Sequence, residues 1–68
     1  MDANSRHKLL DAGWRILRRD DTPNIRIKVF SRGEALNADW RTLEVFTSKA
    51  ARDRRFKELM SDLKTIDD

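Results

Sequence analysis

Residues 25–30 carry the pattern that most restricts the fold of this chain. Isoleucine or valine at 25, 27 and 29 alternates with Arg26, Lys28 and Phe30. Successive side chains of a β-strand point to opposite faces, so this alternation predicts a strand over about 25–31 with one aliphatic face and one basic, aromatic face. The Asp-Asp-Thr-Pro-Asn run at 20–24 is the strongest turn signal in the chain and places a turn directly before the strand.

The segment before this turn is predicted as a short helix followed by a strand. Asn4 or Ser5 can cap a helix over about 4–12, and Gly13 follows where a left-handed residue closes a helix. The chain then leaves as a strand over about 14–19. The alternative is one longer helix, because apolar residues between 9 and 17 also fall on one helical face, with the glycine inside it.

A third strand is predicted at 40–46, after a connection over 31–39 that holds Gly33 and a helical turn at 34–38. The even-numbered residues from Trp40 to Phe46 share one face of this strand, and Leu43 and Val45 share the other.

The last predicted element is a helix over about 48–64. Thr47 or Ser48 is the expected N-cap, and apolar residues recur at spacings of three and four. This stripe consists of Ala51 or Arg52, Phe56, Leu59, Met60 and Leu63. Asp67 and Asp68 are expected to form a frayed, acidic tail.

The order α-β-β-β-α predicts a single α+β domain over residues 1–68, built as a two-layer sandwich. In this prediction a three-stranded antiparallel sheet carries both helices on its aliphatic face, and the other face stays open to solvent. A chain of this size buries only about 60% of the surface that it exposes when unfolded, and it has no cysteine to reinforce a thin core.

Composition excludes several classes of function. His7 is the only histidine and cysteine is absent, so a metal site of several histidines or cysteines cannot form within one chain, and the sequence shows no fingerprint of a nucleophile, base or cofactor. We therefore predict a non-enzymatic protein without cofactor or metal. No apolar run approaches the ~20 residues of a membrane span, and the absence of cysteine fits a reducing compartment. We expect a soluble, cytoplasmic protein that does not enter a membrane.

The charge pattern points to a polyanion as partner. Fifteen basic residues face twelve acidic ones, and the basic residues concentrate at 14–32 and 49–57, whereas 58–68 is acidic. Lys and Arg supply most non-specific affinity for nucleic acid, and aromatic rings on a sheet can stack on bases. We therefore predict binding of DNA or RNA through the open face. The residues predicted for this surface are Arg15, Arg26, Lys28, Phe30, Trp40, Lys49 and Arg52.

The alternative function is contact with a protein partner or with a second copy of the chain as a homodimer. The same patch of Trp40 and Phe30 would form this interface, because interface hot spots favour tryptophan and arginine.

Three resemblances accompany this interpretation. The predicted order of elements and the motif Ser48-Lys49-Ala50-Ala51-Arg52 resemble double-stranded-RNA-binding domains, whose final helix begins with a basic, alanine-containing phosphate-binding motif. Residues 40–62, beginning Trp-Arg-Thr-Leu-Glu-Val-Phe, together with 9–18, resemble small proteins of Bacteroides-type bacteria, and this resemblance implies no activity. A three-stranded sheet followed by a helix is also similar in fold to the DNA-binding arms of some transposon integrases.

Overall fold

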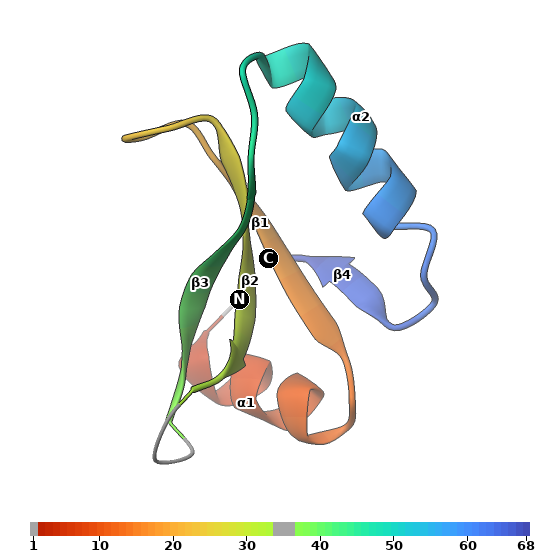
Figure 1. Cartoon of the computed structure of the whole chain (residues 1–68). Coiled ribbons are helices and arrows are strands. Elements are labelled where there is room, and N and C mark those ends of the chain that lie inside the picture. Colours follow the sequence, from red (N-terminus) through yellow and green to blue (C-terminus); the bar gives the residue numbers. More distant parts are fainter. Residues whose placement is uncertain (1, 34–36) are drawn as a thin grey trace.

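The described part of the chain forms two helices and a four-stranded mixed sheet, so the α+β class is confirmed (Figure 1). The computed structural model describes residues 2–33 and 37–68. In chain order the elements are α1 (Ala3–Asp11), β1 (Arg15–Asp20), β2 (Arg26–Arg32), β3 (Ala38–Val45), α2 (Lys49–Leu59) and β4 (Thr65–Asp67). The strand order is β3-β2-β1-β4, with β2 antiparallel to β1 and β3, and β4 parallel to β1. The prediction of a three-stranded antiparallel sheet is wrong because it lacks β4.

The sheet has two distinct faces, which cross-strand pairing defines. Phe30 pairs with both Ile16 and Trp40, so these three side chains share one face. Leu17 pairs with Val29 and lies on the other face, because neighbouring residues in a strand alternate.

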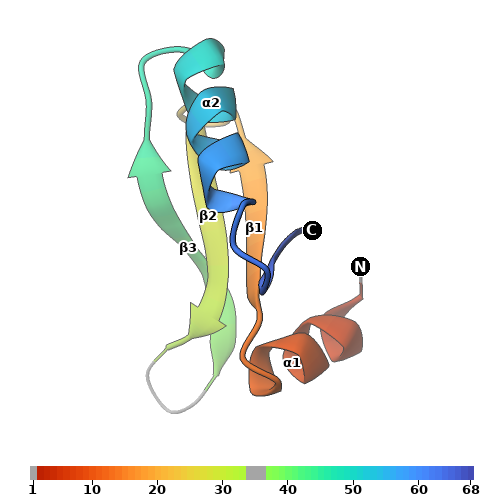
Figure 2. The ribbon, with the colours of Figure 1, turned by 90° about the vertical axis from the view of Figure 1, so that its right-hand side faces the viewer.

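Each helix covers a different face. The ring of His7 in α1 meets the ring of Phe30 edge-on, with 5.6 Å between centroids. Phe56 in α2 packs instead with Leu17 and Ile27. We therefore call the two sides of the sheet the α1 face and the α2 face. Figure 2 shows α1 at the end of the sheet where β1 begins and α2 near the end where β1 finishes.

The prediction that both helices lie on one face is therefore wrong. The physical reason lies in β1, where the adjacent residues Ile16 and Leu17 are both fully buried although they point to opposite faces. Burying both requires cover on both sides of the sheet. The core is accordingly split into an α1-side part around Ile16 and Phe30 and an α2-side part around Leu17, Ile27 and Phe56.

Helix α1 ends at the predicted glycine. Gly13 has a φ of 89°, and its N–H donates to the Leu10 carbonyl at 3.0 Å. The N–H of Trp14 donates to the Leu9 carbonyl at 2.9 Å, which completes a Schellman ending. The alternative of one longer helix is therefore wrong. At the other end the N-cap is Asp2, whose carboxylate accepts from the Ser5 N–H at 2.8 Å, so neither Asn4 nor Ser5 is the cap.

Helix α2 starts as predicted but ends early. The hydroxyl of Ser48 accepts from the Ala51 N–H at 3.1 Å and forms the N-cap. The helix stops at Leu59, and the predicted extension to residue 64 is wrong. The hydroxyl of Ser61 donates to the Glu58 carbonyl at 2.6 Å in the turn that follows. Leu63, expected in the apolar stripe, is 91% exposed. The chain then returns beside β1 as β4, so the expected frayed tail is instead paired to the sheet.

The hairpin strands β2 and β3 contain one irregularity. Lys28 pairs with Thr42 and Ile27 pairs with Glu44, so Leu43 is an extra residue in β3. This bulge moves Glu44 to the α2 face, and the prediction that it shares a face with Trp40 is wrong. The helical turn predicted at 34–38 falls largely on residues 34–36, which lie outside the described residues, while residue 38 already belongs to β3.

Candidate nucleic-acid interface

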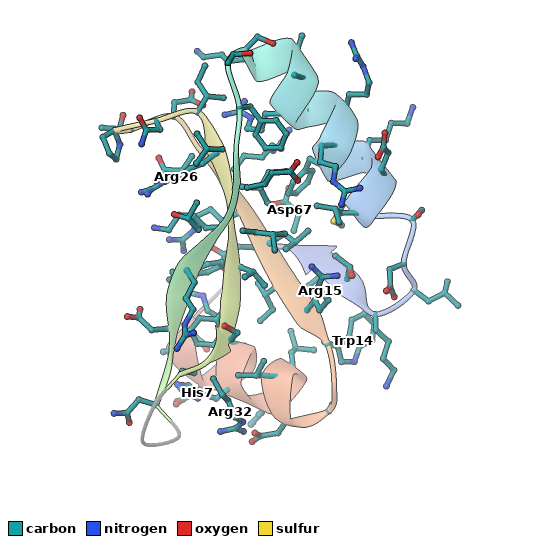
Figure 3. All side chains as sticks on the ribbon, viewed as in Figure 1. His7, Trp14, Arg15, Arg26, Arg32 and Asp67 are labelled. Atoms are coloured by element: carbon teal, nitrogen blue, oxygen red, sulfur yellow. The ribbon has the colours of Figure 1, made fainter. Side chains whose placement is uncertain are left out.

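The residues predicted for the binding surface do not share one face. Arg26 and Lys28 lie on the α1 face, as does Trp40, since cross-strand pairing and alternation place them together. Arg15 lies on the α2 face, because its neighbour Ile16 is the residue that pairs with Phe30. Figure 3 shows Arg15 and Arg26 on opposite sides of the sheet. The prediction that Arg15 joins this surface is therefore wrong.

The aromatic residues of the α1 face are occupied by contacts within the protein. Phe30 is only 5% exposed and lies under His7, so it cannot stack on a base as predicted. The Trp40 ring lies 5.3 Å from the Phe30 ring, centroid to centroid. The guanidinium carbon of Arg18 lies 4.0 Å from the centroid of the Trp40 ring, and that of Arg6 lies 5.6 Å from it. Such cation–π contacts hold guanidinium groups in place, so the Trp40 ring positions Arg6 and Arg18.

Two ion-pair groups lie next to each other on the α1 face, because Arg18 of one and Lys28 of the other are cross-strand partners. We call them together the basic cluster. It consists of the cations Arg6, Arg18, Arg26 and Lys28 and the carboxylates Asp20 and Asp68. Four cations surround two carboxylates, so the group keeps an excess of two positive side-chain charges.

Asp20 joins the two predicted cations of the cluster. Arg26 donates from Nη2 to the Asp20 carboxylate at 3.0 Å, and Lys28 Nζ lies 3.9 Å from the same oxygen. Arg26 also donates to the hydroxyl of Thr42 at 3.3 Å. A hydrogen bond from the Thr22 N–H, followed by that from Arg26, holds the pKa of Asp20 below its usual value. The Asp20 carboxylate therefore stays ionised and orients both cations.

Asp68 joins the other two cations. Its carboxylate accepts from Arg6 Nε at 3.0 Å and from Arg18 Nε at 3.0 Å, although these arginines lie on α1 and β1. Only 11% of the Asp68 side chain is exposed. Burial raises the pKa of Asp68, but the hydrogen bonds from Arg6 and Arg18 outweigh burial and leave this pKa below its usual value. Arg6, Arg18 and Asp68 are not among the residues that the sequence predicts for the binding surface.

A partial signal for these missed residues is present in the sequence. Arg18 is two residues after Ile16 and lies on the same face of β1, so pairing Ile16 with Phe30 places Arg18 beside Lys28. Arg6 and Asp68 carry no such signal, because the positions of α1 and β4 over the sheet depend on tertiary packing.

Lys49 and Arg52 lie at the start of α2 and are engaged by acids. Arg52 is 7% exposed and forms ion pairs with Asp21 and with Asp53, the latter at 3.0 Å. Lys49 Nζ lies 3.4 Å from the other oxygen of the Asp21 carboxylate. The hydrogen bond from Arg52 is the main cause that lowers the pKa of Asp21. Asp21 therefore engages both cations at the start of α2, and the prediction that Arg52 belongs to the open binding surface is wrong.

Residues 2–33 and 37–68 contain no group of three or more metal-ligating side chains and no pocket. Within the same ranges neither helix is long and apolar enough to cross a membrane. No protein-family model, curated protein or solved structure matches the chain.

Proposed function

We propose that the protein is a small, non-enzymatic module that binds nucleic acid through the basic cluster of its α1 face. The observation that carries this proposal is the excess of two positive side-chain charges on two adjacent ion-pair groups of the same face. The side chains of Arg18 and Lys28 are 35% and 20% exposed, so both remain within reach of a phosphate. Phosphate contacts of this kind supply most non-specific affinity for DNA and RNA.

The expected mode of binding is contact with the phosphate backbone. Phe30 is buried and the Trp40 ring is engaged by Arg18, so base stacking contributes little. Phosphate contacts orient a nucleic acid without reading its sequence. Binding should therefore show weak sequence preference and a strong dependence on salt.

A matched pair of lysine variants tests this proposal. Lys28→Gln removes a cation from the basic cluster, whereas Lys57→Gln makes the same chemical change on an exposed residue of α2. Fluorescence anisotropy with labelled single-stranded and duplex DNA and RNA, measured over a series of salt concentrations, gives affinity and salt slope. We expect Lys28→Gln to weaken binding and to reduce the slope of log K against log salt by about 0.7–0.9, the value for one lost phosphate contact. Lys57→Gln should leave this slope unchanged.

Two further results bear on the proposal. Arg15→Gln removes an arginine from the opposite face and should have no more effect than Lys57→Gln. Equal weakening by all three variants would show that net charge alone attracts the polymer, and the basic cluster would lose its role. Absence of binding to every polymer at low salt would refute the proposed function.

Contact with a second copy of the chain is the second candidate function, and a different observation favours it. β3 lies at the edge of the sheet, where Leu43 and Val45 are 40% and 57% exposed. Edge strands with exposed apolar residues tend to pair with another chain. Analytical ultracentrifugation over a range of concentrations tests this candidate, with Val45→Lys as the variant that should restore a monomer. A wild-type monomer at all concentrations would exclude it.

A further inference from the structure

The carboxylate of Asp68 lies in the basic cluster as an anion would lie in a binding site. Two guanidinium groups from separate elements converge on it, each through Nε at 3.0 Å. The neighbouring Asp67 differs in this respect, since its side chain is 47% exposed and meets Arg19 at 3.5 Å. Asp68 therefore has a defined environment that the other acid at this end of the chain does not share.

The two arginines that hold Asp68 are also positioned by contacts of their own. Arg18 lies over the Trp40 ring, and its strand is buried on both sides at Ile16 and Leu17. Arg6 approaches the same ring from α1. Because these contacts do not involve Asp68, the two guanidinium groups should stay close together when the carboxylate leaves. Guanidinium groups hydrogen-bond phosphate oxygens with the same geometry that they use for carboxylates.

The attachment of Asp68 to the sheet is slight. β4 has only three residues and lies at the edge of the sheet beside β1. The N–H of Arg15 donates to the Lys64 carbonyl at 2.7 Å, and the N–H of Asp68 donates to the Leu17 carbonyl at 2.9 Å. Short edge segments of this kind open locally at a lower free energy than the whole domain unfolds.

We propose that Arg6 and Arg18, supported by Trp40, form a phosphate-binding site that Asp68 occupies as an intramolecular ligand. The proposal deepens the function proposed above and rests on it: a nucleic-acid phosphate displaces the Asp68 carboxylate and takes over its hydrogen bonds to Arg6 and Arg18. The segment that carries β4 thus competes with the polymer and lowers the affinity of the protein for nucleic acid.

The experiment compares Asp68→Asn with Asp67→Asn. Both variants remove one negative charge from adjacent positions, but only the first removes the resident ligand. We expect Asp68→Asn to tighten oligonucleotide binding by about tenfold, which corresponds to 1.4 kcal/mol, and Asp67→Asn to change it by less than about twofold. The double variant Asp68→Asn, Arg18→Gln should lose this increase in affinity for the oligonucleotide. If both asparagine variants bind the oligonucleotide more tightly by the same factor, the proposal is overturned, because the change in affinity is then a general effect of charge.

A second measurement separates this proposal from the proposed function. The Nε–H resonances of Arg6 and Arg18 are followed by NMR during titration with inorganic phosphate, for the wild type and for Asp68→Asn. We expect both resonances to shift, at lower phosphate concentration in the variant, and hydrogen exchange of the Asp68 amide in the wild type to quicken as phosphate is added. Shifts with phosphate but no binding of any oligonucleotide would keep the site and refute the function. Binding of oligonucleotides with silent Arg6 and Arg18 resonances would keep the function and refute the site.

Discussion

Truncation of Phe30 tests the arrangement in which α1 and α2 cover opposite faces of the sheet. In the structure this side chain is 5% exposed and packs against His7 and Trp40. Removing a buried phenylalanine side chain costs about 3–5 kcal/mol, whereas an aromatic residue on a wet sheet face contributes only about 0.2–1 kcal/mol through its cross-strand pair. The free energy of unfolding therefore distinguishes a covered α1 face from an open one.

The size of the domain sets how this cost appears. A chain of 68 residues has a total stability of about 3–10 kcal/mol at the usual value per residue. Phe30→Ala should therefore remove a large fraction of it, and the milder Phe30→Leu gives a variant that stays folded. Phe30→Leu loses the edge-on contact with His7 and the contact with Trp40, so we expect a loss of about 1 kcal/mol. With a urea m-value of about 1 kcal/mol/M, the unfolding midpoint should fall by about 1 M.

Two controls complete this experiment. Ile27→Val lies on the α2 face in a fully buried position and should cost about 0.5–1.5 kcal/mol. Val45→Ala changes a residue that is 57% exposed and should stay within about 0.5 kcal/mol of the wild type. If Phe30→Ala behaves like Val45→Ala, α1 does not cover this face and the reasoning fails.

Three further predictions concern caps and charges. Gly13→Ala places a side chain at a φ of 89° and should lower the free energy of unfolding by about 1–2 kcal/mol in urea titrations, whereas no loss would contradict the Schellman ending. Ser48→Ala should lower the free energy of unfolding by about 1 kcal/mol in the same assay, and Ser48→Thr should restore most of that loss. Equal stability of Ser48→Ala and the wild type would contradict the cap. Asp20 and Asp21 have pKa values below the unfolded value of 3.8, so the unfolded chain binds more protons in acid. Their contribution should be complete above about pH 5 and be lost as the pH falls below about 4, and thermal melts with unchanged stability at pH 3 would contradict this.

The sequence predicts local structure well where one pattern dominates. The alternation in β2 has a single local interpretation, and the favoured interpretation of Gly13 as the end of α1 is confirmed. Ser48, one of two predicted caps, is the cap because its side chain meets a backbone N–H three residues later. These features depend on neighbouring residues in the chain. They do not require knowledge of what packs on them.

The errors arise where distant segments decide the outcome. The apolar pair Ile16 and Leu17 is compatible with a helix or with either register of a strand, and only pairing with β2 fixes which residue faces α1. The three residues of β4 are too few to show a period, and their place beside β1 follows from the return of the chain after α2. The prediction for Arg15 places it on the wrong face for the first reason, and the prediction that Asp68 is frayed fails for the second.

The placement of the acids links binding to stability in a way that net charge does not predict. Asp68 joins α1 to β1 through Arg6 and Arg18, so the carboxylate that competes with phosphate also holds two elements together. Asp68→Asn should therefore bind nucleic acid more tightly and at the same time melt at a lower temperature. A part-buried ion pair of about 1 kcal/mol corresponds to a fall in Tm of about 4–8 °C for a domain of this size. Asp67→Asn, with a half-exposed carboxylate, should change neither quantity appreciably. Differential scanning calorimetry of the two variants beside the binding assay tests this link, and an Asp68→Asn protein with the Tm of the wild type would show that the carboxylate contributes no net stability in this position.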